Sequence, residues 1–185
     1  GLTFKALDAL SLSLDMYSVQ VDDRIVYSSS IASSDTTSAV GAILNDYNVT
    51  SIKFFTNAVS TTTSGIDFVG TYSGLELGPG VLNLSLGFNQ NKTVLGDEIN
   101  TPTPIASSGA ELFDRKEQSR LVSARPSNKL ILGLNYLVGS LEIGLNNTQF
   151  GTVKWQHASD ESKDQTFGAK LVTDLNLSYK VDNNL

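Results

Sequence analysis

The sequence of 185 residues contains no cysteine and only one histidine, His157. The absence of cysteine excludes disulfide bonds, thiolate zinc sites and cysteine nucleophiles, and one histidine cannot form a histidine cluster for a metal. Charged residues make up 17% of the chain, below the usual quarter, and Ser, Thr, Asn and Gly take up the difference. The formal net charge of −6 argues against nucleic acid as a partner, because no cluster of cations would neutralise its phosphates.

Long hydrophobic runs are also missing from the chain. No stretch of about 18 consecutive apolar residues occurs, so the sequence contains no candidate transmembrane helix. A transmembrane β-barrel would escape this test, because only alternate residues of its strands are apolar.

The sequence alternates instead, most clearly over Val81–Asn91. Its even positions are Leu and Phe as far as Phe88, whereas the odd positions after Val81 are Asn, Ser and Gly. This pattern predicts a strand with two different faces. The Asn/Ser/Gly face suits a water-filled interior, with the Leu/Phe face turned to lipid. A strand of a soluble sandwich is the alternative, although such strands usually carry Lys, Glu and Thr on the outside.

The same alternation recurs along the chain and predicts an all-β fold, an antiparallel up-and-down meander of about six transmembrane strands. Residues 1–5 are interpreted as the end of a further strand. In the first full strand the apolar set changes phase after Met16, which a β-bulge or a departure from the apolar layer would explain. The six predicted strands span residues 10–22, 54–73, 81–91, 129–137, 141–155 and 166–181.

The predicted connections alternate in length. Short turns on one rim and long loops on the other are the arrangement of outer-membrane barrels. Apolar residues at helical spacing predict a short helix near residues 38–46, and a second short helix is expected over Glu111–Arg120. The long loops are predicted over 23–53, 92–128 and 156–165, and the short turns near 6–9, 74–80, 138–140 and 181–184.

Three tyrosines share a position in this pattern. Tyr72, Tyr136 and Tyr179 each lie on the predicted apolar face just before a short turn. At one level they would form part of an aromatic girdle, with rings in the membrane interface and hydroxyls in water. The alternative is that tyrosine is simply common in strands.

Four segments, in order along the chain, resemble those of the TonB-dependent outer-membrane receptors. They are Leu10–Ile25, Phe54–Phe68 (FFTNAVSTTTSGIDF), Leu112–Leu121 followed by Pro126, and Leu171–Val181. Each segment is weakly specific alone, but together they cover nearly the whole chain. The resemblance implies a bacterial outer-membrane barrel of 22 strands filled by a plug, on which TonB acts.

The resemblance implies that residues 1–185 form a single partial domain from the C-terminal part of such a barrel. The plug would then precede Gly1, and the last strands would follow Asn184. The implied function is that of a barrel-wall segment of a receptor that takes up a scarce ligand, of siderophore, vitamin or oligosaccharide class, with energy from TonB. Its partners would be outer-membrane lipid, the plug and, through the plug, TonB. Two alternatives remain open: a secreted or surface β-sheet adhesin, and a passive porin.

Two groups of residues are candidates for function under this resemblance. Positive charge gathers in the longest predicted loop and could contact an anionic ligand, such as a ferric siderophore or lipopolysaccharide phosphate. The alternative is a solvated helix face whose cations pair with Glu111 and Glu117. The candidate ligand-binding cations are Arg115, Lys116, Arg120 and Arg125, and the residues predicted to face the lumen are Asp15, Asp67, Asn83, Asn135, Asn146 and Asp174.

No catalytic constellation is evident. His157 is followed by Asp160 and Glu161, but a Ser-His-Asp interpretation has little weight because serine is abundant throughout the chain. The glycine-containing stretch 74–80 is too short and wrongly placed for a phosphate-binding loop. We therefore predict no enzymatic activity and no cofactor.

Overall fold

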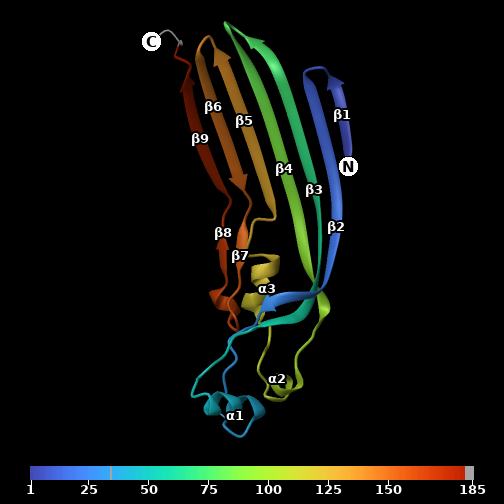
Figure 1. Ribbon diagram of the computed structural model, residues 1–185, viewed down its shortest axis with the longest axis vertical. Coiled ribbons are helices and arrows are strands. Elements are labelled where there is room, and N and C mark those ends of the chain that lie inside the picture. The colour runs from blue at the N-terminus through green and yellow to red at the C-terminus, as the bar shows by residue number, and fades with distance from the viewer. Residues whose placement is uncertain (34, 182–185) are drawn as a thin grey trace.

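The computed structural model describes residues 1–33 and 35–181. Seven strands form one antiparallel sheet in the order β1-β2-β3-β4-β5-β6-β9, and β7 and β8 form a separate two-stranded ribbon (Figure 1). The antiparallel meander predicted from the sequence is confirmed. The strands are β1 (Leu2–Leu7), β2 (Leu10–Tyr27), β3 (Phe55–Leu77), β4 (Gly80–Ile99), β5 (Asn128–Val138), β6 (Leu141–Phe150), β7 (Val153–Trp155), β8 (Gln165–Phe167) and β9 (Lys170–Tyr179).

The sheet contains one strand more than the six predicted, because the segment interpreted as a strand end pairs with β2. The long connections carry three short α-helices, and one of them lies where the sequence predicts it, near residues 38–46. Among the described residues, no helix is long and apolar enough to cross a membrane. The helices are α1 (Ala39–Asp46), α2 (Thr103–Ser107) and α3 (Arg115–Val122), with a 3₁₀ turn over Glu161–Lys163.

Strands β2, β3 and β4 are longer than their predicted ranges. β2 continues to Tyr27 and β4 to Ile99, so the long loops begin later than residues 23 and 92. The leucine alternation stops earlier, but threonines and valines continue the backbone pairing, with Thr61–Thr63 opposite Thr93–Leu95. Backbone pairing does not require an apolar side chain, so the apolar pattern underestimated the strands.

The β-bulge suggested at Met16 is wrong. β2 and β3 pair in unbroken register from Leu10 opposite Tyr72 to Val21 opposite Thr61. The register first shifts between Val21 and Arg24, where Asp23 has a φ of 48°. The change of apolar set along β2 therefore reflects different surroundings of a continuous strand.

Two other predicted segments are divided differently. Most of the predicted turn 74–80 belongs to β3, which continues to Leu77 past a register shift near Gly74, whose φ is 78°. The predicted strands 141–155 and 166–181 each break, because their loop-side ends leave the sheet and pair with each other as β7 and β8. The turn predicted at 181–184 lies, beyond residue 181, outside the described residues.

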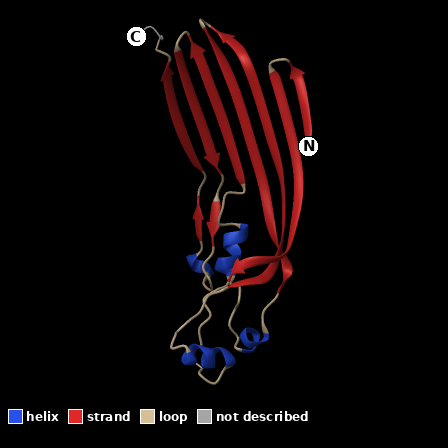
Figure 2. Ribbon diagram, in the orientation of Figure 1, coloured by secondary structure: helices blue, strands red, loops and turns tan. Residues whose placement is uncertain are grey.

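The helices and long connections gather at one end of the sheet, opposite the tight turns (Figure 2). Buried hydrophobic side chains are concentrated at this end and join the β2–β3 connection to the β4–β5 connection. We call this cluster, with the loops that carry it, the loop unit. Its buried residues are Val26, Ile31, Val40, Leu44, Ala58, Val59, Ile105, Leu112 and Phe113.

The leucines of the sheet itself remain open to solvent. Leu132 is 44% exposed and Leu175 is 62% exposed, values unlike those of a sandwich core. No second layer covers this sheet within the described part of the chain. The sheet is therefore a single-layered wall, as expected of a segment of a barrel. The packed hydrophobic core lies at one rim of this wall.

Candidate functional site

The register of the sheet separates its residues into two faces. Because directly paired residues of antiparallel strands point to the same side, each row across the sheet has one orientation. One row joins Leu12, Leu86 and Leu132, and the next joins Ser11, Ser85 and Gly133. We call the side of the first row the leucine face and the side of the second row the polar face.

All six residues predicted to face the lumen lie on the polar face. They form three direct cross-strand pairs, which sequence spacing alone did not reveal. Asn89 also donates a hydrogen bond to Asp67, and Asn91 donates one to Asn89 over 2.8 Å. The pairs are Asp15 with Asp67, Asn83 with Asn135, and Asn146 with Asp174.

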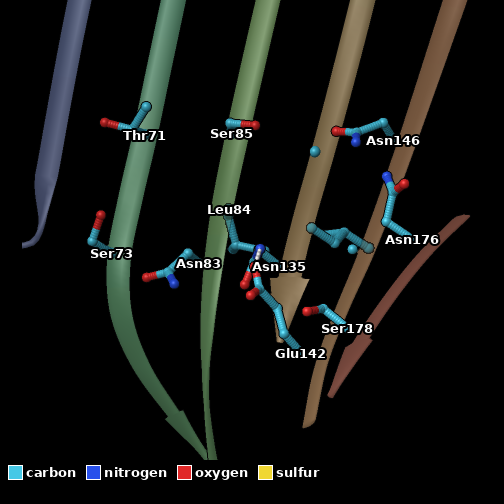
Figure 3. A pocket seen from close by; sticks show the side chains of 13 residues that line it. Thr71, Ser73, Asn83, Leu84, Ser85, Asn135, Glu142, Asn146, Asn176 and Ser178 are labelled. Carbon is cyan, nitrogen blue, oxygen red and sulfur yellow. Dashed lines mark hydrogen bonds between the residues drawn. The ribbon is translucent and has the colours of Figure 1, made fainter. Parts of the chain in front are cut away.

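A hollow of about 410 Å³ lies on the polar face between β3 and β9. Gly133 makes room for it, since a Cβ atom there would come within 2.2 Å of Ser85 Oγ. Figure 3 shows amide and hydroxyl side chains from neighbouring strands around the hollow. Its polar side chains are Thr71, Ser73, Asn83, Ser85, Asn135, Glu142, Asn146, Asn176 and Ser178.

The hollow is lined by amide and hydroxyl groups, which both donate and accept hydrogen bonds, and by the carboxylate of Glu142. Asn135 donates through Nδ2 to Glu142 Oε1 over 2.6 Å, and its own Oδ1 is buried without a hydrogen-bond partner among the described residues. A buried acceptor without a partner is unfavourable, so this site suits a group that donates hydrogen bonds. Glu142 and Asn176 were not among the predicted lumen residues. Their polar alternation with Ile143 and Leu177 was the signal that would have found them.

Comparison with known proteins agrees with this two-faced geometry. The model of the family "TonB dependent receptor-like, beta-barrel" matches residues 1–185. The chain belongs to the TonB-dependent receptor β-barrel family. This is a family of receptors and transporters, in agreement with the resemblance seen in the sequence.

One solved structure similar to this TonB-dependent receptor barrel chain is that of the outer membrane transporter YddB from Escherichia coli. The TM-score is 0.62 at 14% sequence identity, a likeness that concerns the fold alone. The match covers 96% of this chain and 25% of that chain, so this chain spans about a quarter of the transporter's length. None of the curated proteins matches the chain.

In this receptor segment, three of the four candidate loop cations form ion pairs inside the loop region. Arg120 Nη1 lies 2.7 Å from Glu117 Oε2, and Lys116 Nζ lies 4.0 Å from Glu117 Oε1. Arg115 Nη2 lies 2.9 Å from Asp164 Oδ2. Arg125 donates to the carbonyl oxygen of Leu121. The structure therefore gives these cations partners within the fold, and their role toward a ligand stays a prediction.

Glu117 is the centre of these contacts. Its side chain is 3% exposed, and Lys53 Nζ lies 3.3 Å from its Oε1 atom. A buried carboxylate needs such partners, because an unpaired charge in a poorly solvated site is strongly unfavourable. Since Lys53 precedes β3 and Glu117 is in α3, their ion pair joins the two long connections of the loop unit.

Asp164 fixes the third long connection to α3. Its Oδ1 accepts the backbone N–H of His157 over 2.9 Å, and its Oδ2 pairs with Arg115. The hydrogen bond from His157 is the main cause that holds the pKa of Asp164 below its ordinary value of 3.8, with Arg115 and Lys154 acting in the same direction. The carboxylate is thus the favoured form where the ribbon β7–β8 meets α3.

Proposed function

We propose that this chain is a barrel-wall segment of a bacterial outer-membrane receptor that takes up a scarce ligand with energy from TonB. The ligand would be of siderophore, vitamin or oligosaccharide class. The leucine face would meet lipid, and the polar face would line the lumen and contact the plug of the same protein. The long loops would face the outside and take part in ligand capture.

The observation that carries this proposal is the exposed leucine face. A strand face this rich in leucine and phenylalanine, open over six successive strand pairs, is unfavourable in water at roughly 25 cal/mol for each Å² of apolar surface. Hydrocarbon removes that penalty, and the closed hydrogen-bond ladder of a barrel satisfies the backbone there. Lipid on one face and an aqueous lumen on the other therefore account for both sets of side chains.

The positions of the three predicted girdle tyrosines support strands that are tilted relative to the membrane. Tyr72 pairs with Leu84, Tyr136 with Leu82, and Tyr179 with Leu141, which itself pairs with Val138. Tyr136 thus lies two residues nearer the short turns than Tyr72, and Tyr179 lies two residues nearer them than Tyr136. An offset of one residue per strand, about 3.3 Å along and 4.8 Å across, places all three at one depth if the strands tilt by roughly 35°. Barrel strands tilt by about 35–45°.

The test uses the full-length gene in Escherichia coli cells that contain or lack TonB. We expect the folded protein in the outer membrane, and uptake of one member of a panel of labelled ferric siderophores, cobalamin and maltodextrins only in cells with TonB. Uptake that is equal in both cell types would indicate the passive porin instead. A monodisperse protein that needs no detergent would indicate the adhesin.

A further inference from the structure

One row of the polar face separates charge across the sheet. At its β2 and β3 end lie Asp15 and Asp67, followed by Asn89 of β4. At its other end lie Lys129 of β5, Phe150 of β6 and Lys170 of β9, each paired with the next. Phe150 is therefore flanked on both sides by lysines on a face otherwise dominated by small and polar residues.

The two lysines are available to a ligand. Neither Lys129 nor Lys170 takes part in an ion pair among the residues that the structure describes. Lys129 Nζ lies 5.3 Å from the centroid of the Phe150 ring, at the distance of a cation–π contact. The Cα atoms of paired residues are about 5 Å apart, so the lysines start about 10 Å from each other with the ring between them.

A row with two apolar side chains lies directly beside these three residues. It joins Ile131, Thr148 and Val172, and Val172 is 45% exposed. On the β4 side Gly87 lowers the surface, where a hollow of about 310 Å³ includes Asp67, Asn89, Lys129 and Ile131 among its lining residues. The site thus combines an aromatic ring, an adjoining apolar floor and two cations.

The site also lies where an incoming ligand would meet it. Phe150 is the last residue of β6, and Lys170 is the first residue of β9. Both therefore lie at the long-loop end of the sheet, close to the connections that carry α3 and the ribbon β7–β8 (Figure 1). The carboxylates at the opposite end of the row would repel an anion from β2 and β3 toward these lysines.

We propose that Lys129, Phe150 and Lys170 form a binding site for a planar aromatic ligand that carries carboxylate groups. The ring system stacks on Phe150 and rests against Ile131 and Val172, and the two lysines each bind a carboxylate at the ligand's edge. This inference rests on the proposed function, because it assumes that the polar face lines a lumen open to ligand.

The experiment measures binding of 2,6-naphthalenedicarboxylate to the full-length receptor in detergent micelles by isothermal titration calorimetry. This probe has a carboxylate at each end of a planar ring system. We expect it to bind more tightly than 2-naphthoate, which has one carboxylate, and than suberate, which has two carboxylates and no ring. Equal affinity for suberate and the naphthalene probe would overturn the role of Phe150.

Variants separate the two parts of the site. We expect K129Q/K170Q to weaken binding of the naphthalene probe about tenfold, since two exposed ion pairs are lost. F150L keeps an apolar side chain but removes the ring, and we expect a loss of about five- to tenfold. The control is K92Q, which removes a lysine from the leucine-face side of β4, where Lys92 pairs with Ser64.

The outcomes keep this inference distinct from the proposed function. Unchanged affinity in both K129Q/K170Q and F150L, or an equal loss in K92Q, would refute the site. If the receptor shows TonB-dependent uptake but does not bind the probe, the site is refuted and the proposed function stands. If the wild-type receptor binds the probe and both variants lose it, the site is supported even where uptake proves independent of TonB.

Discussion

Leu132 and Leu84 both lie on the leucine face but at different expected depths. Leu132 is four residues from Tyr136 along β5, whereas Leu84 pairs directly with Tyr72. Four residues at a tilt of roughly 35° correspond to about 11 Å, close to half of the apolar band of about 25 Å. Under the proposed membrane orientation, a girdle formed by the three tyrosines would place Leu132 near the middle of the bilayer and Leu84 near its boundary.

Substitution of these two leucines by arginine is expected to have unequal effects. L132R should lower the free energy of unfolding by about 2–4 kcal/mol, and L84R by about 0–1 kcal/mol, because the penalty of a charge falls toward the interface. The measurement is urea unfolding of the full-length protein in lipid vesicles. N83R, on the polar face beside Leu84, serves as the control and should be mild. Equal losses in all three variants would contradict the assignment of faces.

Asp164 gives the loop region a pH dependence whose sign follows from its pKa. Because the folded pKa lies below the ordinary 3.8, the carboxylate stabilises the fold above pH 3.8, and this contribution is lost as the pH falls through the folded value. We expect the protection factor of the His157 amide, corrected for intrinsic exchange, to be lower at pH 3 than at pH 5.

The matched variant for this prediction is D164N. An asparagine there keeps an acceptor for the amide of His157 but has no charge to lose, so its protection should change little between the two pH values. A pH effect of the same size in D164N would disprove the role of the carboxylate.

At the scale of elements, α3 shows why the local sequence pattern predicted the helix but not its first residue. The predicted helix Glu111–Arg120 begins later, at Arg115, because the Asp114 side chain accepts the N–H of Glu117 over 2.9 Å and so caps the helix. Leu112 and Phe113 are instead buried in the loop unit. A capping aspartate was visible in the sequence, but the contacts that bury the two preceding residues come from distant loops. The helix α2, with five residues, has no detectable period.

Phe113 is expected to hold the loop unit together as one element. It is 2% exposed, and the neighbouring Leu112 carbonyl accepts the backbone N–H of Ser29 over 2.9 Å. F113A should destabilise the loop unit by about 3–5 kcal/mol, because it removes a large buried ring and leaves a cavity. Hydrogen exchange in the full-length protein should then accelerate in α1 and α3 but not in the centre of β5.

The control for this variant is I43A in α1, where Ile43 is 47% exposed. It shortens an apolar side chain outside the buried cluster and should leave exchange in α3 unchanged. If F113A accelerates exchange only in residues adjacent to position 113, the long loops do not form one cooperative unit.

For the whole molecule, the sequence predicted the features that depend on alternation. These are the antiparallel meander, the two faces and the gathering of long loops on one rim, because side-chain periodicity reports directly on what each face meets. The hollow beside Asn135 and the row from Asp15 to Lys170 depend on register between strands far apart in the chain. Register follows from turn and bulge positions such as Gly74, which alternation does not specify.

The tilt of the strands is a property of the whole molecule that can be predicted from the depths of the girdle tyrosines. If Tyr72, Tyr136 and Tyr179 share one depth, the strands tilt by roughly 35°, and the strands of a closed barrel tilt alike. Polarised infrared dichroism of the amide bands, measured on the full-length receptor in oriented bilayers, should therefore give an average tilt of about 35–45°. With strands parallel to the membrane normal, Tyr72 and Tyr179 would differ in depth by about 13 Å, four residues' rise, and the hydroxyl of one would lie in hydrocarbon. A measured tilt below about 20° would thus exclude a common girdle, and with it the depth assigned to Leu132.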